Sequence, residues 1–204
     1  MERKHIILPF VYMVLLASCS NGDQKTGETK NEAANQIIAE SGHSAAFNQS
    51  LANLMNAYYN VKDALVEADT SAANKASVTL VTAADSLKAD ELKVDTIVYK
   101  TIVNFTGNIA AEAKGLAGEN DITEKRRSFS MITENLYPLL QAIKYDQQMV
   151  YHQYCPMAFN DDETAYWLSN TSEVINPYLG KKHPKYAAGM LHCGDTQDSL
   201  GVRR

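Results

Sequence analysis

One stretch of the sequence, residues 44–148, constrains the fold more than any other. Apolar residues recur there every three or four positions, and proline is absent until Pro138. This spacing places the apolar side chains on one face of each helix. Four segments follow from it: 44–69, 71–89, 94–118 and 121–143. Because short polar turns join them, we predict an antiparallel four-helix bundle that buries the four apolar faces together.

The third segment is ambiguous at its start, since residues 94–103 are rich in β-branched side chains that favour a strand. Val98, Ile102 and Phe105 nevertheless begin a helical repeat that lasts four turns, so we predict a helix. In the fourth segment, Asp121 predicts an N-terminal cap. The basic run 125–127, which follows this cap, is expected to be solvated.

The overall composition is that of an ordinary soluble domain. The chain has 204 residues, of which 45% are hydrophobic and 21% are charged, and its formal net charge is −5. This acidic balance argues against binding to nucleic acid, which needs clustered Lys and Arg. We predict a single helical domain over 44–204, made of the bundle at 44–148 and a C-terminal segment at 149–204.

The N-terminus has the pattern of a secretory signal. Arg3 and Lys4 precede an apolar run from Ile6 to Leu16, which is too short to span a membrane as a helix. The run ends in Leu-Ala-Ser-Cys, which is similar to the bacterial lipobox. The alternative is an uncleaved N-terminal anchor with an incidental cysteine. We therefore predict a signal peptide at 1–18 and lipid attachment at Cys19.

Lipid attachment would place the protein in the cell envelope. Acyl chains on Cys19 would anchor it to the membrane without spanning it. Residues 19–43, which are mostly polar, are expected to form a flexible tether. Because no Asp follows Cys19, we expect the protein on the periplasmic side of the envelope and at the outer membrane.

After Lys144 the composition changes. This part of the chain contains six of the eleven tyrosines, the only tryptophan, and Cys155 and Cys193. Residues 150–154 and 165–168 are typical of short strands, and they flank an acidic turn at 161–163. The remainder is predicted to be ordered loop. Since the segment is too small for a core of its own, we expect its aromatic residues to pack on the bundle.

Two clusters in this segment combine soft donor atoms. The first is Cys155-Pro-Met157 and the second is Met190-Leu-His192-Cys193. Thiolate and thioether sulfurs prefer Cu(I) and Ag(I), and imidazole is an acceptable further ligand. Residues two apart on an extended chain point to the same side, so both sulfurs of the first cluster can reach one ion. The candidate metal ligands are Cys155, Met157, Met190, Cys193, His192 and His152.

Other interpretations of the cysteines stay open. If Cys19 carries lipid, Cys155 and Cys193 are left to pair as a structural disulfide, which an oxidising compartment favours. Two inert thiols are a further possibility. Activation of Cys155 by His152 or His192 would make a nucleophile, but no catalytic signature accompanies these residues. We therefore expect the protein not to be an enzyme.

The motifs YCPMAFN, AYWLSN, INPYLG and MLHCG, within residues 154–194, resemble a family of periplasmic lipoproteins known as domain of unknown function 3347. The helical segments are similar to that family's helical part. Members of the family occur together with adaptor subunits of copper and silver efflux pumps, so the resemblance implies metal handling and an efflux adaptor or another envelope protein as partner. The chain departs from the family pattern between Gly180 and Met190, where its loop is longer. This departure puts in question whether Met190 and Cys193 meet Cys155.

Two functions from different classes follow from the sequence. The first is an envelope lipoprotein that binds Cu(I) or Ag(I). The second is an interaction module without metal, in which a Cys155–Cys193 disulfide supports a Tyr and Trp surface that docks on an envelope protein.

Overall fold

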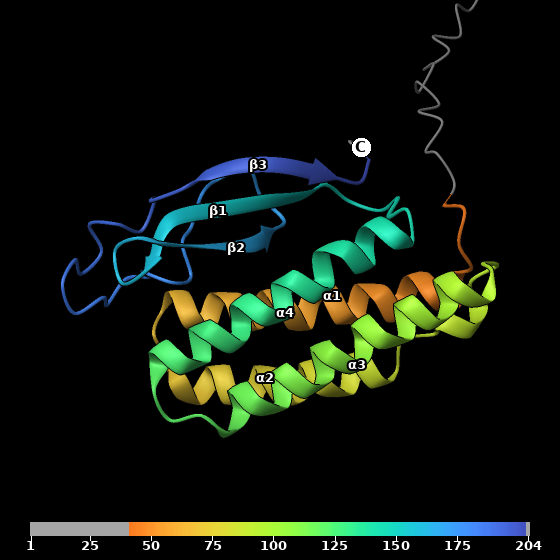
Figure 1. Cartoon of the computed structure of the whole chain (residues 1–204), viewed down its shortest axis with the longest axis horizontal. Coiled ribbons are helices and arrows are strands. Elements are labelled where there is room, and N and C mark those ends of the chain that lie inside the picture. Colours follow the sequence, from red (N-terminus) through yellow and green to blue (C-terminus); the bar gives the residue numbers. More distant parts are fainter. Residues whose placement is uncertain (1–40, 203–204) are drawn as a thin grey trace, which may run out of the picture. The chain divides into compact units, whose positions relative to one another are not determined.

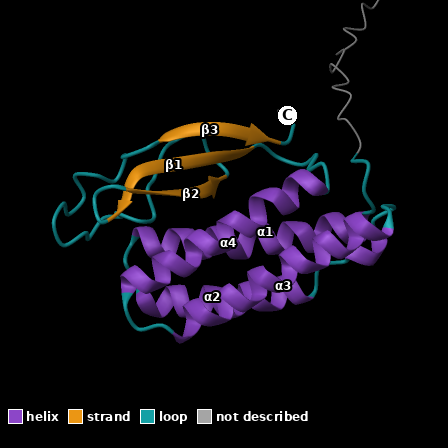
Figure 2. Ribbon diagram, in the orientation of Figure 1, coloured by secondary structure: helices purple, strands orange, loops and turns teal. Residues whose placement is uncertain are grey.

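The computed structural model describes residues 41–202. Its elements are α1 (Ala45–Val66), α2 (Thr70–Asp85), a short 3₁₀ turn (Ala89–Glu91), α3 (Thr96–Gly118), α4 (Ile122–Ala142), β1 (Val150–Phe159), β2 (Glu163–Ser169) and β3 (Asp195–Leu200). The four helices lie side by side, and a small sheet follows them (Figures 1 and 2). The predicted fold class, a four-helix bundle followed by a segment of short strands and loops, is confirmed.

Side-chain caps set the starts of the helices. The hydroxyl of Ser44 accepts a hydrogen bond from Phe47 N, and the carboxylate of Asp121 accepts from the backbone N–H groups of Thr123 and Glu124. Such caps satisfy the donors that a helix leaves unpaired at its start. The predicted cap at Asp121 is confirmed. The ambiguous third segment is also helical, because its apolar repeat buries Ile102 and Ile109 completely.

The second helix ends earlier than expected, and the third ends at Gly118 as expected. The second helix stops at Asp85, and a separate 3₁₀ turn begins at Ala89. The third continues through Gly115 to Gly118. Glycine costs a helix only about 1 kcal/mol, so Gly115 does not end α3 by itself.

The expectation that the basic run 125–127 is solvated is wrong for two of its three residues. Lys125 is 0% exposed and Arg126 is 4% exposed. The Lys125 ammonium donates to the side-chain oxygen of Asn74 and to the carbonyl oxygens of Leu116 and Glu119. The carbonyls lie at the C-terminal end of α3, where the helix dipole favours a positive charge. Lys125 therefore links three helices from inside the bundle.

The sheet is antiparallel, with the strand order β2-β1-β3. The β1–β2 hairpin confirms the two predicted strands and the turn between them. β3 was expected to be loop, and that expectation is wrong. Its sequence, DTQDSL, has no alternation of apolar and polar residues, and none of its side chains is buried. Its strand structure depends on pairing with β1, from Val150 to Tyr154.

Aromatic side chains join the sheet to the helices, as expected. The ring of Phe129 in α4 stacks on Tyr58 of α1 at 4.9 Å and contacts Tyr178. Tyr178 in turn packs edge-on against Trp167 of β2. The buried apolar cluster is continuous from the helices into the sheet, so the C-terminal segment shares the core of the bundle.

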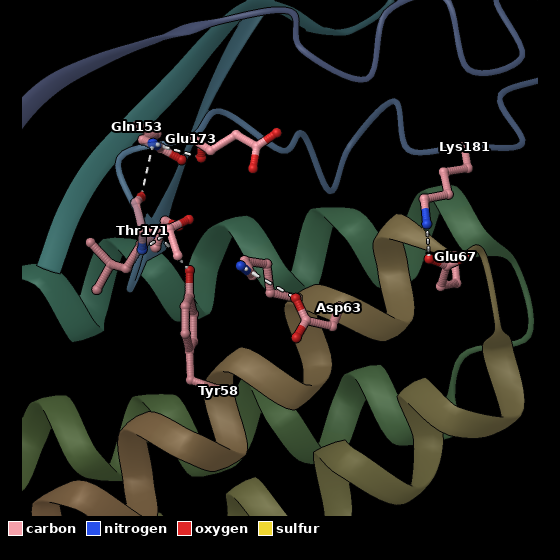
Figure 3. Close-up of polar contacts among 10 residues, drawn as sticks. Tyr58, Asp63, Glu67, Gln153, Thr171, Glu173 and Lys181 are labelled. Atoms are coloured by element: carbon pink, nitrogen blue, oxygen red, sulfur yellow. Dashed lines mark hydrogen bonds and ion pairs between the residues drawn. The ribbon is translucent and has the colours of Figure 1, made fainter.

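A chain of buried hydrogen bonds crosses the same junction. The backbone N–H of Leu168 donates to the Tyr58 hydroxyl at 3.0 Å, and this hydroxyl lies 2.7 Å from Thr133 Oγ1. Figure 3 shows Tyr58 pointing from its helix toward the sheet. On the outside, the ammonium of Lys181 pairs with Glu67 at the end of α1 (Figure 3). These contacts fix β2 and the following loop on the helices.

Within residues 41–202, none of the helices combines the length and the hydropathy needed to cross a membrane. The predicted signal peptide, the lipid site at Cys19 and most of the predicted tether lie outside the described residues.

Candidate functional site

The two cysteines of the C-terminal segment meet. Their Sγ atoms are 2.9 Å apart, although 38 positions separate them in the sequence. This separation is longer than a disulfide bond of about 2.05 Å, and the sulfurs are in hydrogen-bond contact as thiols. Cys155 is buried on β1, opposite Ala165 of β2, and Cys193 is half-buried just before β3. The longer loop between Gly180 and Met190 therefore does not keep Cys193 from Cys155.

Burial holds the Cys193 thiol in the protonated state. It raises the pKa of the Cys193 thiol to about 12, with a further contribution from the hydrogen bond and the charge of Cys155. A thiol with a raised pKa is a poor nucleophile near neutral pH. A metal ion that binds here would have to displace the proton, so its affinity would increase with pH.

The loop around Cys193 is fastened by an asparagine and a glycine. Asn176, which is fully buried, donates from Nδ2 to the carbonyl of Cys193 at 2.9 Å, and its own N–H donates to Leu191 O. Gly194 has a φ of +130°, and a Cβ at this position would lie 2.1 Å from the carbonyl oxygen of Tyr154. The absence of a side chain is what allows the loop to lie against β1.

The methionines of the two clusters are half-buried and pack against the core. Met157 follows Cys155 by two positions, but the β1–β2 register is irregular between Cys155 and Phe159. Met190 begins a turn, and its carbonyl oxygen accepts a hydrogen bond from the backbone N–H of Cys193 at 3.0 Å. Both thioethers therefore belong to the segments that carry the two thiols.

The two predicted histidines have partners other than the thiols. His192 is exposed, and its Nδ1 lies 2.8 Å from the carbonyl oxygen of Val174. His152 stacks on Tyr166, whose partner across the sheet is Tyr154, whereas Cys155 is opposite Ala165. Because neighbouring residues of a strand point to opposite faces, His152 and Cys155 lie on different faces of β1. The structure therefore does not bring His152 to Cys155.

His152 belongs instead to an aromatic column between the sheet and α4. Its ring lies between Tyr137, at 3.9 Å, and Tyr166, at 5.0 Å. The Tyr137 hydroxyl donates to the carboxylate of Asp198 on β3. Burial lowers the pKa of His152, and the charge of Asp198 opposes this shift only in part. The imidazole is therefore neutral in the folded protein at neutral pH.

We expect the column to make stability depend on pH. Because the pKa of His152 is lower in the folded than in the unfolded state, the unfolded chain binds the proton more readily. The free energy of unfolding should therefore fall as the pH drops below 6.5, the ordinary value, toward the folded-state pKa. The variant His152→Phe keeps a ring in the column, but this ring takes up no proton. Its free energy of unfolding should therefore fall less at low pH than that of the unmodified protein. The measurement is urea unfolding at several pH values.

The control for this experiment is His192→Gln, which alters an exposed histidine. It should keep the decline of the unmodified protein. Equal pH dependence in His152→Phe and the unmodified protein would show that His152 does not supply the effect.

Two buried polar atoms on the cysteine face have no hydrogen-bond partner in the described part of the chain. They are Gln153 Oε1 and Trp167 Nε1, and the two residues are opposite each other across β1 and β2. The Gln153 amide nitrogen faces the carbonyl oxygens of residues 171–173 at 3.3–3.5 Å (Figure 3). Buried polar groups are normally satisfied. These two atoms, which lie on the same face of the sheet as Cys155, are therefore free to form further hydrogen bonds.

Among residues 41–202, no group of three or more His, Cys, Asp or Glu side chains is arranged to hold a metal ion. The acidic turn at 161–163 is solvent-exposed, and Asp161 pairs with Lys185. The donors that the described residues bring together at the cysteines are therefore the two sulfurs of Cys155 and Cys193. This is the donor set that Cu(I) and Ag(I) prefer.

The family comparison agrees with the helical architecture. The family model described as "Protein of unknown function (DUF3347)" matches residues 54–148. Residues 54–148 belong to the DUF3347 family. The match ends just before β1, so the C-terminal motifs that suggested the DUF3347 resemblance lie beyond the matched residues. No curated protein and no solved structure matches the chain.

Sequence reasoning missed the residues that place Cys193. Asn176 stands before a proline, as turn residues commonly do, and Gly194 directly follows the cysteine. Both patterns indicate special backbone geometry. Neither one reveals which strand the loop approaches, which is why their role emerges only from the structure.

Proposed function

We propose that this protein is a lipid-anchored envelope protein that binds one Cu(I) or Ag(I) ion through Cys155 and Cys193. The observation that carries the proposal is the convergence of the two sulfurs to 2.9 Å from segments far apart in the sequence. In this proposal Cys19 holds the lipid, and the metal cargo passes to an efflux adaptor or another envelope protein, as the family resemblance implies.

The surroundings of the cysteines support a soft, singly charged ion. One thiol is buried in the core and the other is half-buried, so a bound ion would be largely shielded from water. Two thiol sulfurs do not complete the four-coordinate shell that a structural Zn²⁺ requires. Soft sulfur donors are the ligands that Cu(I) and Ag(I) prefer.

The test is a titration of the reduced protein with Cu(I) against a competing chelator. The full chain is used with Cys19→Ser, so that no lipid is attached and only two thiols remain. We expect one Cu(I) to bind per chain, and Cys155→Ser and Cys193→Ser each to weaken binding by about a hundredfold or more. Met157→Leu and Met190→Leu should weaken it less, since thioethers are secondary ligands here.

Matched controls separate the site from general effects. Met131→Leu makes the same change at an exposed methionine of α4, and Asp162→Asn removes a carboxylate from the acidic turn. Neither should alter Cu(I) affinity. A protein that is purified with a complete disulfide, and takes up no Cu(I) tightly after gentle reduction, would refute the proposal.

The same short distance favours a second candidate, a Cys155–Cys193 disulfide in an interaction module without metal. Oxidation would close a covalent loop of 38 steps and stabilise the fold by about 3–4 kcal/mol. The expected docking role of Trp167 is wrong, because this side chain is 0% exposed. A docking surface would rest on the half-buried tyrosines, such as Tyr154 and Tyr186. Counting free thiols before reduction separates the two candidates.

A further inference from the structure

A pocket of about 390 Å³ lies where the start of α4, the β1–β2 turn and the loop after Tyr178 meet. Thr123 and Arg126 come from one face of α4, Asp161 from the turn, and His183 from the loop. Phe159 and Tyr178 also line the pocket. None of these residues belongs to the cysteine site, so the pocket is a separate candidate site.

The decisive residue in the pocket is Arg126. Its Nε donates to the carbonyl of Pro177 at 2.9 Å, and one terminal nitrogen, Nη2, donates to the carbonyl of Leu65 at 3.2 Å. Within the described ranges, the other terminal nitrogen has no hydrogen-bond partner, and no carboxylate forms an ion pair with the guanidinium. Arg126 is only 4% exposed. Burial lowers its pKa to about 10, so it is still charged at neutral pH.

The charge of Asp121 favours the charged guanidinium, although Asp121 forms no ion pair with it and accepts from the backbone N–H groups of Thr123 and Glu124. A buried positive charge without an ion-pair partner is unfavourable unless something compensates it. The carbonyl of Leu65 belongs to the last turn of α1, so the helix dipole supplies part of the compensation. Carbonyl dipoles do not replace a full negative charge. The planar guanidinium presents its donors in a fork that matches the oxygens of a carboxylate or a phosphate.

Among the lining residues, the remaining charged groups do not cancel the charge of Arg126. Asp161 is the one carboxylate among the lining residues, and its two oxygens accept from the Lys185 ammonium and the Tyr186 hydroxyl. Burial lowers the pKa of His183, and the charges of Arg126 and Lys185 add to this shift against the opposing charge of Asp161. His183 thus experiences neighbouring positive charge that Asp161 does not cancel.

We propose that this pocket binds a small oxyanion, a phosphate or a carboxylate, whose oxygens accept from Arg126 with His183 and the Thr123 hydroxyl beside them. The volume suits a small molecule. The guanidinium is held in place by two backbone carbonyls before any ligand arrives, so little side-chain entropy would be lost on binding. The proposal does not depend on metal binding at the cysteines.

The test is NMR titration of the full chain with Cys19→Ser, using inorganic phosphate in one arm and acetate in the other, at constant ionic strength. We expect the resonances of His183 and Thr123 to shift with at least one anion and the pKa of His183 to rise on binding. The arm that gives the tighter binding identifies the class of oxyanion. Arg126→Gln keeps a hydrogen-bond donor but removes the charge, and it should weaken binding about tenfold or more.

The matched control is Lys182→Gln, which removes one positive charge from the exposed residue next to His183. It should leave the affinity within about twofold, because exposed charges are screened. Should Arg126→Gln fail to fold, Thr123→Val supplies the second measurement, with a severalfold loss expected. The proposal is overturned if neither anion shifts the resonances of His183 and Thr123. It is also overturned if Arg126→Gln and Thr123→Val, where they fold, bind the anion as tightly as the unmodified protein.

Discussion

Gly194→Ala is expected to separate Cys155 from Cys193 and to lower the free energy of unfolding by about 3 kcal/mol. The added methyl group would lie 2.1 Å from the carbonyl oxygen of Tyr154 and 3.0 Å from the ring of Trp167, at a φ of +130° that only glycine adopts readily. Since β1 and Trp167 belong to the core, the loop has to move. Urea unfolding measures the first effect, and the rate of Cys155–Cys193 disulfide formation in a mild oxidant measures the second.

The matched control is Gly107→Ala. Gly107 lies inside α3, and a Cβ there would meet no atom within 4 Å. Alanine is the better helix former by about 1 kcal/mol, so this variant should be slightly more stable and should oxidise at the unmodified rate. If Gly194→Ala also oxidised at the unmodified rate, the close approach of the loop to β1 would not be what pairs the cysteines.

The helices could be predicted because their signals are local. The repeat of Leu51, Leu54 and Tyr58 occupies one face of a single helix, and Asp121 caps the helix that it precedes. β3 could not be predicted, because its pairing partner is more than forty positions away and its own side chains are polar and unburied. Strand formation there depends on the edge that β1 offers, which is a property of the folded sheet.

The two buried cations were missed for a different reason. Composition suggested a solvated basic run, yet Lys125 precedes Phe129 by four positions and continues the inward face of α4. The periodicity therefore indicated that Lys125 is buried. What the sequence could not show is the compensation, since Asn74, Leu116 and Glu119 approach the ammonium only after α2, α3 and α4 have packed.

The candidate site was predictable in its residue types but not in its geometry. Cys155, Met157, Met190 and Cys193 are recognisable as soft donors from the sequence, and the thiols do meet. Strand alternation separated His152 from them, because the register places it with Tyr166 rather than with Ala165. A difference of one residue in register reverses the face on which a side chain lies, and sequence patterns rarely fix register that closely.

The bundle and the cysteine site can be tested as separate parts of the molecule through Lys125. We expect Lys125→Met to lower the free energy of unfolding by about 3 kcal/mol, because it fills similar space but leaves the oxygens of Asn74, Leu116 and Glu119 without their buried donor.

Lys114→Met makes the same change at an exposed position of α3 and should stay within about 0.5 kcal/mol. Because the hydrogen bonds of the Lys125 ammonium go to α2 and to the C-terminal end of α3, disulfide formation in the folded variant should keep its unmodified rate. Gly194→Ala should show the converse, with paired thiols lost while the helical circular dichroism is retained. A change in thiol pairing in Lys125→Met under native conditions would mean that the bundle does more than support the sheet, and that its packing sets the geometry of the cysteines.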